Sequence, residues 1–176
     1  MRGVTFMTND VLNWTYQNVK LYVRDLTCDW HLLQLYQKNQ ILTDPSYIEM
    51  SYKLGGMLKE HNTRFCILSA HAMDMTELEH GTDWGLAVLP ANSYFKVLSI
   101  FAIQNKTFIV LLQIKPEHQT FHIENKISID EQFVELVKAK MKEVSHQEVV
   151  SFLKDDLWIK KVNFPIGLTL DGTFFH

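Results

Sequence analysis

Residues 95–114 read FKVLSIFAIQNKTFIVLLQI, two apolar runs rich in β-branched and aromatic residues that are joined across Asn105-Lys106. Both alternating sets of side chains are largely apolar, which is typical of strands covered on both faces rather than of a hairpin with one face in water. Asn tolerates the positive φ that a two-residue turn requires. The stretch therefore predicts a central β-hairpin on which a larger sheet is built.

Shorter strand signals flank this hairpin. RFCILS at residues 64–69 is a continuous apolar run, and LAVL at residues 86–89 is a second one that ends at Pro90. Near the C-terminus, Asp171-Gly172 is a favoured turn pair and predicts a small second hairpin. Residues 118–127, HQTFHIENKI, show no clear period and predict irregular or edge-like chain.

Helical spacing dominates the first sixty residues. From residue 12, apolar residues recur at spacings of 4, 3, 4 and 3, which predicts one helical stripe over residues 12–26. An alternating strand over residues 19–23 is the competing interpretation. A second helix is expected after Asp29, a favoured capping residue.

A third helix is predicted from Thr43-Asp44-Pro45, a capping residue followed by Pro at the first helical position. It is expected to end near His61. Gly55-Gly56 lies inside this helix, and we interpret the pair as a place of close packing against another element, with a hinge or kink as the alternative.

Two later helices have capping-box starts, Ser128 with Glu131 and Ser145 with Glu148. The fold class that follows is α+β. We expect one compact domain over residues 1–176, in which N-terminal helices and the two later helices flank a mostly antiparallel sheet built on the hairpin 95–114. Residues 1–8 are expected to be a disordered extension.

Composition limits the classes of function. The chain has 176 residues, 47% apolar residues and a net charge of −3, as an ordinary globular domain does. The absence of a basic excess argues against nucleic-acid binding, and we interpret the lysines of segments 138–142 and 160–161 as solvated. No apolar run is long enough to cross a membrane. Cys28 and Cys66 are too few for a disulfide framework, so we expect a cytoplasmic protein.

The loop after the strand at 64–69 is the densest group of polar side chains. Loops that leave strand ends often hold reactive groups. The candidate catalytic residues in it are Ser69, His71, Asp74, His80 and Asp83, and those for a metal are His71, His80 and Asp83.

Two chemistries are open for this loop. One is hydrolysis by a Ser69 nucleophile activated by His71, although the flanks lack the glycine-framed elbow that exposes such a serine. The other is a site for zinc, manganese or iron, although the spacing matches no established ligand motif. The alternative to both is a solvated connection whose acids cap a short helical turn at 76–80.

The function hypothesis rests mainly on the motifs that are missing. There is no catalytic motif and no Gly-rich phosphate loop, so no cofactor is expected. Aromatic residues are frequent in the helical half and would form an interaction face if exposed: Trp30, Tyr36, Tyr47 and Tyr52. We therefore expect a non-catalytic, cytoplasmic protein-binding domain, a regulator, inhibitor or immunity-type partner of an unidentified protein. A small hydrolase or metal-dependent enzyme using the loop 69–83 is the alternative, which leaves both enzymatic activity and homo-oligomerisation open.

Overall fold

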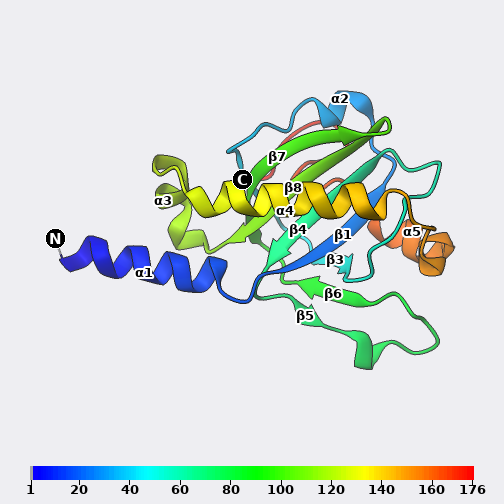
Figure 1. Ribbon diagram of the computed structural model, residues 1–176, viewed down its shortest axis with the longest axis horizontal. Helices are drawn as coiled ribbons and strands as arrows, with labels where there is room; N and C mark the ends of the chain where they lie inside the picture. Colours follow the sequence, from blue (N-terminus) through cyan, green and yellow to red (C-terminus); the bar gives the residue numbers. More distant parts are fainter. Residues whose placement is uncertain (1) are drawn as a thin grey trace.

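The computed structural model describes the backbone of residues 2–176 and the side chains from Thr8 onward (Figure 1). In this part of the chain, five α-helices surround one mixed sheet of eight strands in the order β2-β7-β8-β4-β1-β3-β6-β5. The strands are β1 (Lys20–Leu26), β2 (Ile41–Asp44), β3 (Ile48–Ser51), β4 (Thr63–Ser69), β5 (Met73–Asp74), β6 (Leu86–Leu89), β7 (Ser93–Ile103) and β8 (Lys106–Ile114). The helices are α1 (Arg2–Tyr16), α2 (Trp30–Leu33), α3 (Gln119–Glu124), α4 (Ser128–Val144) and α5 (Asp156–Val162).

The predicted hairpin forms the middle of this sheet. Strands β7 and β8 pair antiparallel. On its other side β8 pairs with β4, in the one parallel pairing among the described strands. The α+β class and the mostly antiparallel sheet are therefore confirmed. The turn lies one residue earlier than expected, because Gln104 and Asn105, with φ of 50° and 64°, are its central residues.

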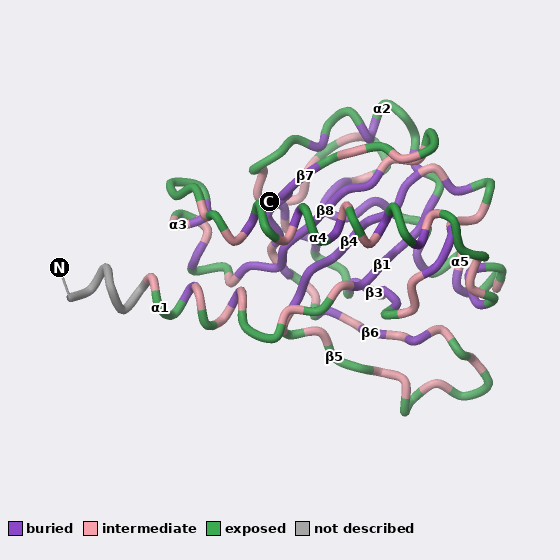
Figure 2. The backbone as a smooth tube through the Cα atoms, viewed as in Figure 1, coloured by how far each residue is buried: buried purple, intermediate pink, exposed green. Residues whose placement is uncertain are grey.

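Each face of the sheet carries its own core. Helix α4 lies across one face, where Val137 and Met141 pack against Val23 and Leu112. In Figure 1 it crosses the front of the sheet. On the other face, α2 and the C-terminal segment 163–176 pack against β1, β3 and β4. Figure 2 shows the strands buried between these two layers.

The helix expected over residues 12–26 is wrong in its second half. Helix α1 ends at Tyr16, and Asn18 follows with φ of 59°, the left-handed conformation that often ends a helix. Residues 20–26 form β1, which pairs with β4 along its whole length. The competing strand interpretation is therefore correct, because pairing with a buried neighbouring strand overrides a helical period.

The helix expected from Thr43 is also wrong. Asp44 ends β2, and its Oδ1 accepts a hydrogen bond from the Ser46 N–H at 2.9 Å, so the capping signal closes a turn between β2 and β3 instead. Gly56 does pack closely, as expected, through a parallel bridge to Val149. The close approach joins two extended segments rather than two helices.

The predictions for the helices after residue 115 are confirmed only in part. Helix α4 forms where it was predicted, but its N-cap residue is Ile127 and no side chain caps it. Ser145 is the C-cap of α4, so no helix starts there; α5 begins after Asp155, whose carboxylate accepts from the Leu157 N–H. The segment predicted to be irregular contains α3. The C-terminal hairpin forms around a bridge from Leu168 to Phe174.

Both cysteines are free and buried, and none of the helices described is long and apolar enough to span a membrane. The suggestion of disorder at residues 1–8 falls mainly on residues 1–7, whose side chains lie outside the part described, and it stays a prediction.

Substituting Gly56 by Ala is expected to destabilise the protein by roughly 1–3 kcal/mol, the usual cost of overpacking. A Cβ at this position would lie 2.3 Å from the backbone oxygen of Gln147, which cannot rotate away. Urea unfolding measures the loss. The control is Gly81→Ala, where no atom lies within 4 Å and only the cost of φ at 75° remains. An unchanged midpoint for Gly56→Ala would contradict the close approach.

Candidate functional site

The loop proposed from the sequence runs from the end of β4 to β6, and its serine is not exposed. Ser69 is buried, and its hydroxyl donates to the side-chain oxygen of Gln113 at 2.6 Å and accepts from the His71 N–H at 2.9 Å. A nucleophile must reach its substrate, and this hydroxyl is enclosed. Its bonds join the loop to β8.

The other candidates in this loop serve local structure. The His71 ring stacks on Trp14 at a centroid distance of 3.9 Å, and its Nε2 lies 2.7 Å from the Trp14 carbonyl oxygen. Asp74 accepts from the N–H and hydroxyl of Thr76, and these bonds lower the pKa of its carboxyl group. His80 is exposed. Asp83 forms an ion pair with Lys53 at 2.5 Å.

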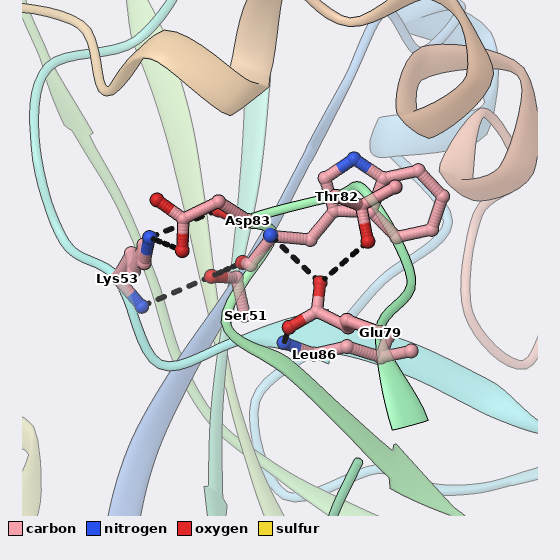
Figure 3. A network of polar contacts seen from close by, with 7 residues as sticks. Ser51, Lys53, Glu79, Thr82, Asp83 and Leu86 are labelled. Atoms are coloured by element: carbon pink, nitrogen blue, oxygen red, sulfur yellow. Dashed lines mark hydrogen bonds and ion pairs between the residues drawn. The ribbon is translucent and has the colours of Figure 1, made fainter. Parts of the chain in front are cut away.

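Glu79, which was not a candidate, organises the end of the loop (Figure 3). Its carboxylate accepts from the Thr82 hydroxyl at 3.1 Å, from the Trp84 N–H at 2.7 Å and from the Leu86 N–H at 3.4 Å. The Trp84 carbonyl in turn accepts from the Ser51 hydroxyl at 2.6 Å. The loop is therefore fastened to β3 by hydrogen bonds, with short η1 (Thr76–Leu78) near its tip.

No group of three or more His, Cys, Asp or Glu side chains in the described part of the chain is placed to hold a metal ion. His71 and Asp83 are bound to different neighbours, Trp14 and Lys53. A catalytic or metal role for Ser69, His71, Asp74, His80 and Asp83 stays a prediction. The contacts of Ser69, His71 and Asp83 hold the loop to neighbouring parts of the chain.

A different site lies on the face of the sheet opposite α4, around Arg24 of β1. Arg24 is only 4% exposed, yet it forms no ion pair with any residue of the described chain. Its Nε donates to the Val162 carbonyl at 3.1 Å and its Nη2 to the Phe164 carbonyl at 2.9 Å. Burial lowers the pKa of Arg24, and the carboxylates of Glu49 and Asp44 act against this shift.

Arg24 lines a cavity of about 530 Å³, within the range of small-molecule sites. Strand β3, the turn before it and the C-terminal segment supply the walls. Both signs of charge and several aromatic rings face it: Asp44, Tyr47, Glu49, Lys161, Phe164 and Phe175. Tyr47 and Phe164 are 61% and 52% exposed, so their rings lie at the rim rather than in the core.

The two acids of this cavity differ in their partners. Both oxygens of Asp44 accept backbone hydrogen bonds, from the Ser46 N–H at 2.9 Å and from the Gly167 N–H at 2.8 Å. Glu49 forms an ion pair with Lys161 of α5 at 3.0 Å. Asp44 is therefore part of the wall, whereas Glu49 is held by one flexible side chain and is the acid available to a ligand.

Arg24 was not predicted as a site residue, because residues 12–26 were interpreted as one helix. The signal that could have found it is the alternation of β1, in which an arginine stands among buried apolar residues. Lys161 was treated as solvated, and Glu49 as part of a helix. Their convergence depends on contacts of β1 and β3 with residues that lie 140 positions after Arg24 and, for Glu49 and Lys161, about 110 positions apart.

No protein-family model matches the chain, and no curated protein matches it. Solved structures of similar arrangement do exist. The ADP-ribosyltransferase HopU1 of Pseudomonas syringae has 18% identity and a TM-score of 0.48, covering 55% of this chain and 45% of its own. The Vis toxin, an ADP-ribosyltransferase from Vibrio splendidus, has 14% identity and a TM-score of 0.44, covering 66% of this chain and 58% of its own. The Clostridium limosum C3 exoenzyme has 10% identity and a TM-score of 0.48, with coverages of 64% and 67%.

The chain thus spans about half the length of the first two of these proteins. The expectation of a non-catalytic regulator, inhibitor or immunity-type partner is wrong in the light of these structures, since the similar proteins named as ADP-ribosyltransferases are catalytic. Three of the four proposed interface aromatics are exposed, but Tyr36 is buried and donates to the Ile166 carbonyl.

Proposed function

We propose that this chain is an ADP-ribosyltransferase that binds NAD+ in the cavity beside Arg24. The proposed reaction, transfer of ADP-ribose, is the one for which the similar proteins HopU1 and Vis are named. The support in this chain is a single observation, a buried guanidinium without a carboxylate partner that lines a small-molecule cavity.

Arg24 would bind the pyrophosphate. A buried cation is costly unless an anion compensates its charge, and here the direct partners of Arg24 are carbonyl oxygens, while Glu49 and Asp44 act on it without a hydrogen bond. The planar fork of a guanidinium matches phosphate oxygens, which makes arginine the usual residue for this ligand. Lys161 adds a second cation at the same cavity. An anionic ligand would therefore supply the direct anionic partner that Arg24 lacks.

Glu49 would act on the other half of NAD+. The nicotinamide ring is cationic, and exposed Tyr47 offers an aromatic face beside the carboxylate. When the bond between the ribose C1′ and the nicotinamide nitrogen breaks, the electron pair leaves with nicotinamide and positive charge develops on the sugar. A carboxylate stabilises such an oxocarbenium-like transition state. The acceptor nucleophile then bonds to C1′ and loses its proton.

The protein partner expected from the sequence then becomes an acceptor of ADP-ribose. We propose the cytoplasm as the place of the reaction, in agreement with two cysteines that are free and buried.

Glu49→Gln is expected to lower kcat for nicotinamide release from NAD+ by about 10²-fold, the usual loss when one electrostatic stabiliser is removed. The amide keeps the size of the side chain and removes its charge. The dissociation constant of NAD+ should change far less, because the charge acts mainly in the transition state. Release is followed by chromatography, and binding by calorimetry.

The matched control is Glu131→Gln. Glu131 is also a glutamate in an ion pair with a lysine, Lys38 at 3.2 Å, but it lies on α4. It should leave kcat unchanged. If wild-type protein neither binds nor cleaves NAD+, the proposal fails; if Glu49→Gln cleaves it at the wild-type rate, the assigned role of Glu49 fails.

A further inference from the structure

The second half of β7 has a partner strand on one side only. Strand β2 pairs with residues 93–96 of β7, and the contact ends at Val97, which exchanges backbone hydrogen bonds of 2.7 and 2.9 Å with Asn39 and Gln40. Beyond this point, residues 99–103 pair with β8, and no other strand of the described chain reaches them. Figure 1 shows this end of β7 at the margin of the sheet, beside α2.

The pairing with β8 determines which backbone groups face outward from this edge. The two-residue turn 104–105 is closed by the pair of Ile103 and Lys106. In such a hairpin the closing pair exchanges both of its hydrogen bonds, and the direction of the backbone groups then alternates along the strand. The groups of Ile103 therefore point to β8, whereas the N–H and carbonyl groups of Ile100 and Ala102 point away from it.

This edge lacks the features that usually prevent strand edges from pairing. Monomeric proteins protect an open edge with charged side chains, Pro or bulges. Residues 98–103 read LSIFAI and contain neither a charge nor Pro, and the irregularity of β7 lies before them, between Val97 and Ser99. Ile100 is 37% exposed, and Ala102 is exposed as well. The edge is therefore a template on which another strand can form hydrogen bonds.

The surface beside the edge is apolar and uncharged. A cavity of about 460 Å³ is lined by α2 and by the ends of β7 and β8, and no charged residue is among its lining residues. Trp30 of α2, at its wall, is 63% exposed. On the other face of β7, Lys138 lies 5.8 Å from the centroid of the Phe101 ring and is paired with Glu135. Two identical copies can therefore meet here without repulsion between unpaired charges.

We propose that this edge binds a second copy of the chain, with β7 pairing antiparallel to β7 about a two-fold axis. When Ile100 of one copy lies opposite Ala102 of the other, the outward N–H groups of both residues meet carbonyl groups. The edge of a second copy is already ordered by its hairpin, so it binds without the entropic cost that ordering a flexible peptide carries. The same edge is used in both copies, so the assembly closes as a dimer. This inference is independent of the proposed function.

Sedimentation equilibrium over a series of protein concentrations tests the proposal. Wild-type protein is expected to reach twice the mass of one chain. Ile100→Lys brings two like charges together across the axis, and Ala102→Pro removes an outward N–H group while leaving the bonds to β8. Each is expected to weaken dimerisation at least about tenfold. The matched control is Ile123→Lys on α3, an isoleucine that is 66% exposed, and it should dimerise as wild type does. Circular dichroism checks that the variants fold.

Hydrogen exchange of the wild-type protein gives a second readout that needs no variant. The amides of Ile100 and Ala102 should exchange more slowly as the protein concentration rises, because dimerisation protects them. A wild-type monomer at every concentration, with these amides unprotected, would overturn the inference and leave the edge to a strand of another protein. A dimer that persists in both Ile100→Lys and Ala102→Pro would overturn it as well, because the interface would then lie elsewhere.

Discussion

Arg64→Met is expected to lower the free energy of unfolding by about 3–5 kcal/mol, the usual cost of leaving one partner of a buried ion pair alone. Arg64 and Asp25 lie opposite each other on β4 and β1, and both side chains are almost fully buried, at 1% and 0% exposure. Two parallel hydrogen bonds join them, Nε to Oδ1 at 2.6 Å and Nη2 to Oδ2 at 2.7 Å. Without Arg64, the Asp25 carboxylate has no cation in an apolar layer between β1 and α4.

Urea unfolding of two further variants makes this test specific. The double variant Asp25→Leu/Arg64→Met removes both charges and is expected to recover most of the loss, because no uncompensated charge stays buried. The control Lys38→Met breaks an ion pair whose partners are 54% and 51% exposed, and it should cost less than about 1 kcal/mol. A single Arg64→Met variant as stable as the control would contradict the burial of this pair.

Acid is expected to destabilise the protein through His122 before most carboxylates titrate. His122 on α3 is 2% exposed, and neither of its ring nitrogens has a hydrogen-bond partner. Burial lowers its pKa from 6.5 to about 4, and the charge of Lys96 adds to this shift, while Asp130 opposes it. His118 from the preceding turn also lowers this pKa, and the Tyr16 ring of α1 lies 6.3 Å away.

The sign of the effect follows from these values. The pKa of His122 is lower in the folded than in the unfolded chain, so the unfolded chain binds the proton first. The full contribution is present above pH 6.5 and is lost as the pH falls towards 4, by roughly 3 kcal/mol in total. The comparison with His122→Phe, measured by urea unfolding at several pH values, isolates this residue. Wild type should lose stability relative to the variant between pH 6.5 and 4; a constant difference would contradict the assigned shift.

The central sheet was accessible to sequence reasoning because its pattern allows one structure. Both alternating sets of residues 95–114 are largely apolar, which is typical of strands covered on both faces, and the two strands are buried except near the turn, where Ile100 and Ala102 are exposed. Residues 19–23 fit both a helical stripe and an alternating strand. What decides between them is β4, which begins 37 residues after the end of β1, and no local window contains that information.

The candidate site was not accessible for the same physical reason. Arg24 is held by carbonyl oxygens of residues 162 and 164, and Glu49 pairs with Lys161. None of these residues stands in a recognisable motif of its own segment. They come together only through contacts between segments that are far apart in the sequence. The loop 69–83 was predicted as a candidate site because its polar residues are close together in the sequence. In the structure, Ser69 and Glu79 use their polar groups to fasten that loop.

A crystal structure of the protein with NAD+ tests the central claim most directly. We predict pyrophosphate oxygens within hydrogen-bonding distance of the Arg24 guanidinium, and the nicotinamide ring in the cavity between Tyr47 and Glu49. NAD+ ordered at another place on the protein, with the cavity beside Arg24 empty, would contradict the account.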